Sequence, residues 1–148
     1  EEIARRKNVI DSLAYRGKGE TILVVDDIKE QRELAINMLT VLGYTVETAA
    51  SGEEAVERLL GKTVDLLLLD MVMDPGMDGL ETYRRILETH PGQKAVIVSG
   101  FSETDRVKKA QALGAGAFVR KPYIMEKIGL AVRRELDRGK DDDVSLET

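Results

Sequence analysis

Short apolar runs that end in polar residues or glycine recur along the chain, and they constrain its fold more than any other feature. The segments between these runs have the apolar spacing typical of helices. Such an alternation predicts a parallel sheet that is covered by helices on both faces. We expect strands at Ile22–Val25, Tyr44–Thr48, Val64–Leu69, Lys94–Val98 and Ala117–Arg120.

Capping residues, glycines and prolines divide the rest of the sequence into helices. Ser51 is a suitable N-cap, acidic Glu53 and Glu54 follow it in the first turn, and Gly61 ends that helix. The other expected helices are Glu30–Leu42, Leu80–Glu88, Ser102–Leu113 and Ile124–Asp137. The predicted fold class is therefore α/β: a flavodoxin-like, doubly wound (βα)5 domain whose five parallel strands have the order 2-1-3-4-5.

The length and composition are those of one small globular domain. The chain has 148 residues, a net charge of −5 and no cysteine, which excludes disulfides and thiolate metal sites. The acidic charge argues against a nucleic-acid surface, and no apolar stretch approaches the ~20 residues of a membrane-spanning helix. No signal-peptide pattern opens the chain. We therefore expect a cytoplasmic protein whose partners include neither nucleic acid nor a membrane.

We expect three regions along the chain. Residues 1–19 would form a helical or flexible N-terminal linker, residues 20–137 the folded domain, and residues 138–148 a disordered acidic tail. The only histidine, His90, lies beside Pro91 and Gly92, and we interpret it as a solvated turn residue.

Polar residues of specific kinds stand where the expected strands end. Asp26 and Asp27 follow the first run, and Asp70 follows the third. The fourth run ends in Ser99 and Gly100, and the fifth leads into Lys121. Because ligands of open α/β sheets bind outside the carboxyl ends of the strands, these residues would meet at one edge. Clustered carboxylates with a lysine suit a divalent cation and phosphate chemistry.

With these four signatures in order, and with Met77-Asp78-Gly79 after Asp70, the chain resembles the receiver domains of two-component response regulators. The resemblance covers residues from Glu20 to about Leu136. A looser similarity, in the stretch from Gly19 to Asp27, is to the receivers of hybrid sensor histidine kinases.

The resemblance implies a phosphoacceptor function. Asp70 would take a phosphoryl group from a phosphohistidine on a sensor histidine kinase or a histidine phosphotransfer domain. The cofactor would be Mg²⁺, held directly by Asp27, Asp70 and the Val72 carbonyl and through water by Asp26. Lys121 and backbone N–H groups near Val72 and Gly100 would stabilise the phosphoryl oxygens.

The resemblance also implies a conformational switch. Ser99 would hydrogen-bond the phosphoryl group, and Phe118 would turn inward, which shifts the surface made by helix 4, strand 5 and helix 5. A homodimer through the fourth and fifth helices is compatible with the resemblance. The domain would catalyse only its own phosphorylation and dephosphorylation, although its parent chain could be a hybrid histidine kinase.

Each of these residues taken alone has a simpler interpretation. Asp26 and Asp27 could form a helix N-cap, Ser99 and Lys121 could be ordinary strand-end residues, and Phe118 could be core. We also interpret Asp78 as a turn and cap residue rather than a ligand. Their joint occurrence at four strand ends favours the receiver.

The sequence leaves two other functions open. One is a receiver-fold interaction module that signals without phosphorylation. The other is a phosphohydrolase with Asp70 as nucleophile, but Val72 stands where such enzymes have a second aspartate, which makes this hypothesis weak.

The loop after Asp70 departs from the family pattern. It is one residue longer than usual, with Asp74 inserted before the proline, and Ile28 stands where an acidic residue is common. Val72 is apolar and cannot orient an attacking water, so we predict slow self-dephosphorylation.

Overall fold

The computed structural model describes residues 14–102 and 104–140. The expected linker helix within residues 1–13 and most of the expected acidic tail, residues 141–148, lie outside the described residues. Within the part described, no helix is both long and apolar enough to cross a membrane.

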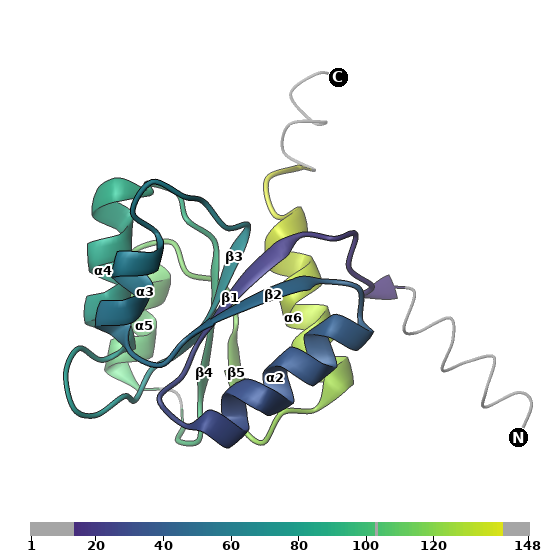
Figure 1. Ribbon diagram of the computed structural model, residues 1–148, viewed down its shortest axis with the longest axis horizontal. Coiled ribbons are helices and arrows are strands. Elements are labelled where there is room, and N and C mark those ends of the chain that lie inside the picture. The colour runs from purple at the N-terminus through teal and green to yellow at the C-terminus, as the bar shows by residue number, and fades with distance from the viewer. Residues whose placement is uncertain (1–13, 103, 141–148) are drawn as a thin grey trace, which may run out of the picture.

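A five-stranded parallel sheet forms the centre of the domain (Figure 1). Its strand order is β2-β1-β3-β4-β5, as predicted. The strands are β1 (Thr21–Val25), β2 (Thr45–Ala49), β3 (Leu66–Asp70), β4 (Ala95–Ser99) and β5 (Phe118–Arg120). β3 is buried along its whole length, which explains why it reads as a continuous leucine run rather than an alternating pattern.

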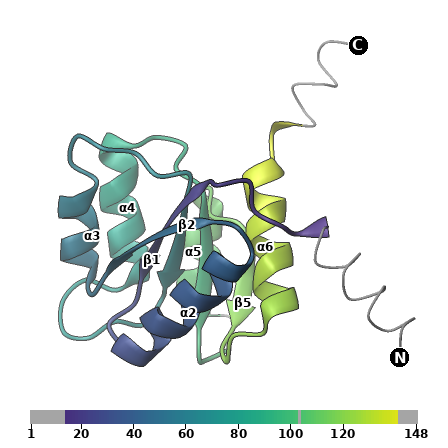
Figure 2. The same ribbon diagram turned by 45° about the vertical axis from the view of Figure 1, so that its right-hand side comes forward.

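Helices cover both faces of the sheet. They are α2 (Lys29–Val41), α3 (Gly52–Arg58), α4 (Gly79–Thr89), α5 (Asp105–Ala112) and α6 (Met125–Asp137). One core cluster joins the sheet to α3, α4 and α5, and a second joins it to α2 and α6. Figures 1 and 2 show this division into two layers around the sheet.

Alternate residues of each strand enter opposite cores, as the period of two requires. Leu23 and Val25 of β1 belong to the α3–α4–α5 side, whereas Ile22 and Val24 belong to the α2–α6 side. Burying a leucine, isoleucine or valine side chain contributes about 1.5–3 kcal/mol, so both helical layers are required for stability.

Side-chain caps fix several helix starts next to the carboxyl edge of the sheet. The Ser51 hydroxyl accepts a hydrogen bond from the Glu54 amide at the start of α3, as predicted. The fourth expected helix starts later than predicted. Thr104 is its N-cap and accepts from the amide of Val107, so Ser102 lies in the preceding loop. Two cis peptide bonds, Asp74–Pro75 and Lys121–Pro122, lie in the loops at this edge.

Candidate functional site

Three carboxylates meet at the carboxyl edge of the sheet. Val25 of β1 pairs with Leu69 of β3, so the next residues of the two strands, Asp26 and Asp70, lie side by side. Asp26 and Asp70 are buried, whereas Asp27 is exposed. One carboxylate oxygen from each of the three lies within 4.8 Å of the others. This oxygen-rich donor set suits a hard divalent cation such as Mg²⁺ or Ca²⁺.

Lys121 brings a positive charge to the same cluster from the end of β5. Its Nζ lies 2.6 Å from Oδ2 of Asp26 and 3.4 Å from Oδ2 of Asp70. The aromatic ring of Tyr123 also faces the ammonium group, with its centroid 5.9 Å from Nζ. The lysine side chain is only 12% exposed, so these neighbours restrict its position. Sequence reasoning missed Tyr123, although its place two residues after Lys121 put it near the site.

Burial makes Asp70 unusually difficult to ionise. Loss of solvation raises its pKa from 3.8 to about 6; Lys121 opposes this rise and the nearby Asp26 adds to it. The backbone amide of Val72 donates a hydrogen bond to Asp70 Oδ1 at 3.3 Å and fixes the orientation of the carboxylate. An additional cation would favour the ionised form, which is the nucleophilic one.

Asp26 is fixed by the backbone around it. Its Oδ1 accepts a hydrogen bond from the Ile28 amide at 2.9 Å, and its carbonyl oxygen accepts one from Arg32 at 2.9 Å. The side chain thus closes a turn just before α2, whose N-cap is Ile28, and its other carboxylate oxygen faces Lys121. Asp26 therefore does not cap α2, and it belongs to the carboxylate cluster.

A pocket of about 460 Å³ opens over the cluster. Of the site residues predicted from the sequence, Asp27, Asp70, Val72, Gly100 and Lys121 line it. Its other lining residues are Ile28, Gln31, Asp74, Phe101 and Pro122. Ile28, Val72 and Phe101 are between 48% and 64% exposed, so the entrance to a highly charged site has an apolar rim. Sequence reasoning identified Ile28 and Val72 at this position but not Phe101 or Gln31.

Ser99 and Phe118 do not line this pocket. Ser99 is the last residue of β4 and is buried, and its hydroxyl accepts a hydrogen bond from the Phe101 amide at 3.1 Å. Phe118 begins β5, is partly buried and packs against the α3–α4–α5 core. Phe118 pairs with Ile97, which is two residues before Ser99, so Phe118 and Ser99 lie on the same face of the sheet.

The loop between β3 and α4 is fixed at its far end. The Glu53 carboxylate accepts a hydrogen bond from the Met77 amide, and the Gly79 amide donates to the Met71 carbonyl at 2.9 Å. Met71 and Met73 are buried, whereas Asp74 is exposed. Asp74, which we interpreted as an insertion, is therefore at the solvent side of the loop, on the rim of the pocket.

Asp78 caps a helix, as interpreted from the sequence. Its Oδ1 accepts from the Glu81 amide at the start of α4, and its Oδ2 pairs with Arg106 of α5 at 2.5 Å. Burial raises the pKa of Asp78, but the hydrogen bond and charge of Arg106 together with the backbone hydrogen bonds at the start of α4 outweigh it, and the net pKa is lowered. Asp78 is therefore a connection between two helices beside the site rather than a member of the carboxylate cluster.

Comparison with known proteins agrees with this geometry. Residues 22–133 match the response regulator receiver domain family. The chain is 33% identical over 117 residues to the sporulation initiation phosphotransferase F of Bacillus subtilis, covering 79% of this chain and 94% of that protein. It is 32% identical over 138 residues to the sensor kinase CckA of Brucella abortus, covering 92% of this chain but only 14% of the kinase.

Solved structures show the same fold. A CheY-like receiver domain protein from Methanospirillum hungatei has a TM-score of 0.77 at 26% identity, covering 84% of this chain and 99% of that one. The N-terminal domain of a response regulator/sensory box/GGDEF three-domain protein from Carboxydothermus hydrogenoformans has a TM-score of 0.75 at 32% identity, with the same coverage. The chain belongs to the response regulator receiver domains of two-component phosphorelay signalling.

Proposed function

We propose that this domain is a phosphoacceptor whose acceptor residue is Asp70. The observation that carries the proposal is the convergence of Asp26, Asp27 and Asp70 with the Lys121 ammonium at the end of the central strand. Asp70 is the member of this cluster that is buried at the base of an open pocket and contacts the lysine. A phosphoryl group entering the pocket would therefore meet Asp70 between a metal site and a fixed positive charge.

The proposed reaction is transfer of a phosphoryl group from a phosphohistidine. A carboxylate oxygen of Asp70 forms a bond to phosphorus, the bond from phosphorus to the imidazole nitrogen breaks, and the imidazole leaves with the electron pair and takes a proton from water. The product is an acyl phosphate. Little covalent chemistry is required of the other residues, so catalysis comes from positioning and charge stabilisation.

Mg²⁺ is the proposed cofactor. Asp27 and Asp70 would hold it directly together with the Val72 carbonyl, and Asp26 would hold it through water. When bound, the cation would supply positive charge beside the phosphoryl oxygens. The Lys121 ammonium would also neutralise charge on the phosphoryl oxygens. To bind one of them it would give up part of its ion pair with Asp26. The amides of Val72 and Gly100, both in residues that line the pocket, would orient the group.

The proposed output is a shift of the surface formed by α5, β5 and α6. Ser99 would exchange its hydrogen bond with the Phe101 amide for one with the phosphoryl group, which moves the loop after β4. Phe118, which lies on the same sheet face and is only partly buried, would then pack further inward. The two positions of Ser99 and Phe118 correspond to two states whose populations phosphorylation changes.

The proposed phosphodonor partner is a sensor histidine kinase or a histidine phosphotransfer domain. Support comes from the two relatives, one named a sensor kinase and the other a phosphotransferase. The chain spans only 14% of the first and 31% of a second long relative, the cyclic di-GMP phosphodiesterase of Thermotoga maritima. We therefore propose only the class of its partner, and no activity for the whole protein.

Intact-mass spectrometry after incubation with acetyl phosphate and Mg²⁺ tests the proposal. We expect one added phosphoryl group on the wild type and none on Asp70→Asn. Asp74→Asn is a matched control, because it removes an exposed carboxylate from the same loop and should leave labelling intact. Absence of an adduct on the wild type, with Mg²⁺ binding shown separately by calorimetry, would contradict the proposal and favour a phosphorylation-independent interaction module.

A further inference from the structure

The residues just before β1, 14–20, are packed onto the domain rather than extended away from it. We call them the N-terminal junction. Residues 14–19 fall in the region predicted to be a helical or flexible linker, and Glu20 is the first residue of the predicted domain. All of them precede the residues that match the receiver family, 22–133. Figures 1 and 2 show this purple segment running between α2 and α6 into β1.

Tyr15 anchors the junction in the α2–α6 core. It is 8% exposed and belongs to the core cluster on that side of the sheet. Its ring lies directly against Gly129 of α6, where a Cβ atom would be 2.9 Å from Cε2 and 3.0 Å from Cγ of the tyrosine. Glycine inside a helix costs about 1 kcal/mol relative to alanine, so the close approach of Tyr15 accounts for its presence here.

Backbone contacts hold the next part of the junction against the turn between α2 and β2. The Gly17 amide donates to the Leu42 carbonyl at 2.6 Å, and the Gly19 amide donates to the Gly43 carbonyl at 3.0 Å. A Cβ atom at Gly17 would lie 2.7 Å from the ring of Tyr44, so this contact also requires glycine. Gly17 therefore serves close packing, whereas Gly19 has open space around it and is needed for its positive φ of 85°.

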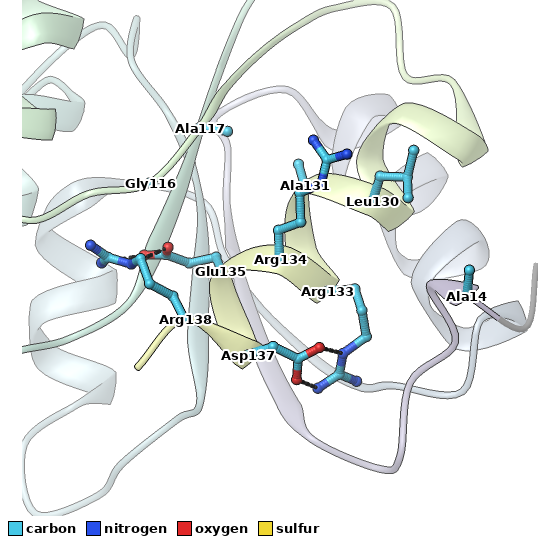
Figure 3. A pocket seen from close by; sticks show the side chains of 10 residues that line it. All are labelled: Ala14, Gly116, Ala117, Leu130, Ala131, Arg133, Arg134, Glu135, Asp137 and Arg138. Carbon is cyan, nitrogen blue, oxygen red and sulfur yellow. Dashed lines mark hydrogen bonds and ion pairs between the residues drawn. The ribbon is translucent and has the colours of Figure 1, made fainter. Parts of the chain in front are cut away.

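Arg133 of α6 joins the two ends of the junction. Its guanidinium group donates to the Arg16 carbonyl at 3.2 Å and pairs with Glu20 at 2.8 Å, and it also pairs with Asp137 of its own helix at 2.8 Å. The side chain is only 8% exposed. Figure 3 shows the two bonds from Arg133 to Asp137, with Ala14 and Leu130 around the same pocket of about 550 Å³.

We propose that the N-terminal junction is a rigid attachment that fixes the chain before residue 14 to α6 and to the α2–β2 turn. The preceding chain would then leave the domain from a defined point, and a displacement of α6 would move it. α6 is part of the surface proposed above to shift on phosphorylation, and that link alone rests on the proposed function. The junction itself can be tested without phosphorylation.

A double-mutant cycle between Tyr15 and Gly129 tests the anchor by thermal unfolding. In the wild-type background Gly129→Ala should lower Tm, because the new methyl group displaces the Tyr15 ring. In a Tyr15→Ala background the same change should raise Tm by about 3–5 °C, because only the helix propensity of alanine remains. Should Tyr15→Ala not fold, Tyr15→Leu provides the background. An increase of Tm in the wild-type background as well would overturn the proposal.

Rigid attachment is tested by a distance measurement between spin labels. The chain has no cysteine, so the changes Ala14→Cys and Lys108→Cys, both at exposed positions, give two labels without other substitutions. We expect a narrow distance distribution that becomes broad with Tyr15→Ala or Tyr15→Leu but not with Arg16→Ala, which retains the carbonyl that Arg133 binds. A broad distribution in the otherwise unchanged chain would contradict rigid attachment.

Discussion

Replacing Asp70 by asparagine should stabilise the domain when divalent cations are removed. Asparagine has nearly the same shape and can still accept the hydrogen bond from the Val72 amide, but it carries no charge. Lys121 keeps its closer partner, Asp26, at 2.6 Å. The change therefore removes a buried charge that is close to another carboxylate and leaves no cation without a partner.

The size of the effect follows from the pKa. Burial raises the pKa of Asp70 from 3.8 to about 6, and one pH unit corresponds to about 1.36 kcal/mol. Ionising Asp70 in the folded protein therefore costs up to about 3 kcal/mol more than in the unfolded chain. The cost is absent below pH 3.8, grows as the pH rises towards 6, and is constant above that value. The asparagine variant should thus gain up to about 3 kcal/mol at pH 8 but under about 1 kcal/mol at pH 4.

Urea unfolding with a chelator at both pH values measures this difference. Asp74→Asn controls for the loss of one negative charge from an exposed position and should not show the same increase with pH. Added Mg²⁺ should stabilise the wild type more than the Asp70→Asn variant and narrow the gap. An equal gain at pH 4 and pH 8, or no gain at pH 8, would refute the account of Asp70 as a desolvated carboxylate.

Three further changes test other parts of the site. Gly79→Ala should lower the free energy of unfolding, measured with urea, by about 2 kcal/mol or more, because its Cβ would lie 2.6 Å from a carbonyl oxygen at the end of β3. The control Gly100→Ala should show no such loss, because there is open space around Gly100. Val72→Asn should shorten the half-life of the phosphorylated domain, because an amide at the pocket rim can orient water, and an unchanged or longer half-life would contradict this. Arg106→Ala should lower the free energy of unfolding by at most about 1 kcal/mol, because its ion pair with Asp78 is partly exposed. In urea unfolding this loss should become smaller at high salt. A loss that does not depend on salt would show that the ion pair is not its cause.

The sequence predicted the strand positions and the carboxylate cluster because both depend on local signals, whereas the strand order followed from the fold class that alternating strands and helices indicate. An apolar run marks a buried strand, and the residue after it must lie at the edge of the sheet. Asp26, Asp70 and Lys121 could thus be placed at one edge without any knowledge of their contacts. The roles assigned to Ser99 and Phe118 stay predictions.

Other features depend on contacts between residues that are distant in sequence, which local patterns do not reveal. The guanidinium group of Arg133 donates to the carbonyl of Arg16, which is 117 positions earlier in the chain. Because no local pattern indicates this contact, the sequence predicts a flexible linker for the glycine-rich segment beside Arg16. His90 was expected to be a solvated turn residue, but both of its ring nitrogens are hydrogen-bonded, to Thr89 and to the Lys62 carbonyl. The start of α5 was placed too early because Ser102 and Thr104 are both acceptable caps, and only the structure distinguishes them.

The edges of the sheet have a consequence for self-association. β5, at one edge, has only three residues and is followed by Lys121 and Pro122, while β2, at the other edge, carries Glu47 in an ion pair with Lys62. Short length, proline and charge all disfavour strand addition to a sheet edge. These features should disfavour edge-to-edge aggregation, so copies of the domain held at high local concentration should not exchange strands.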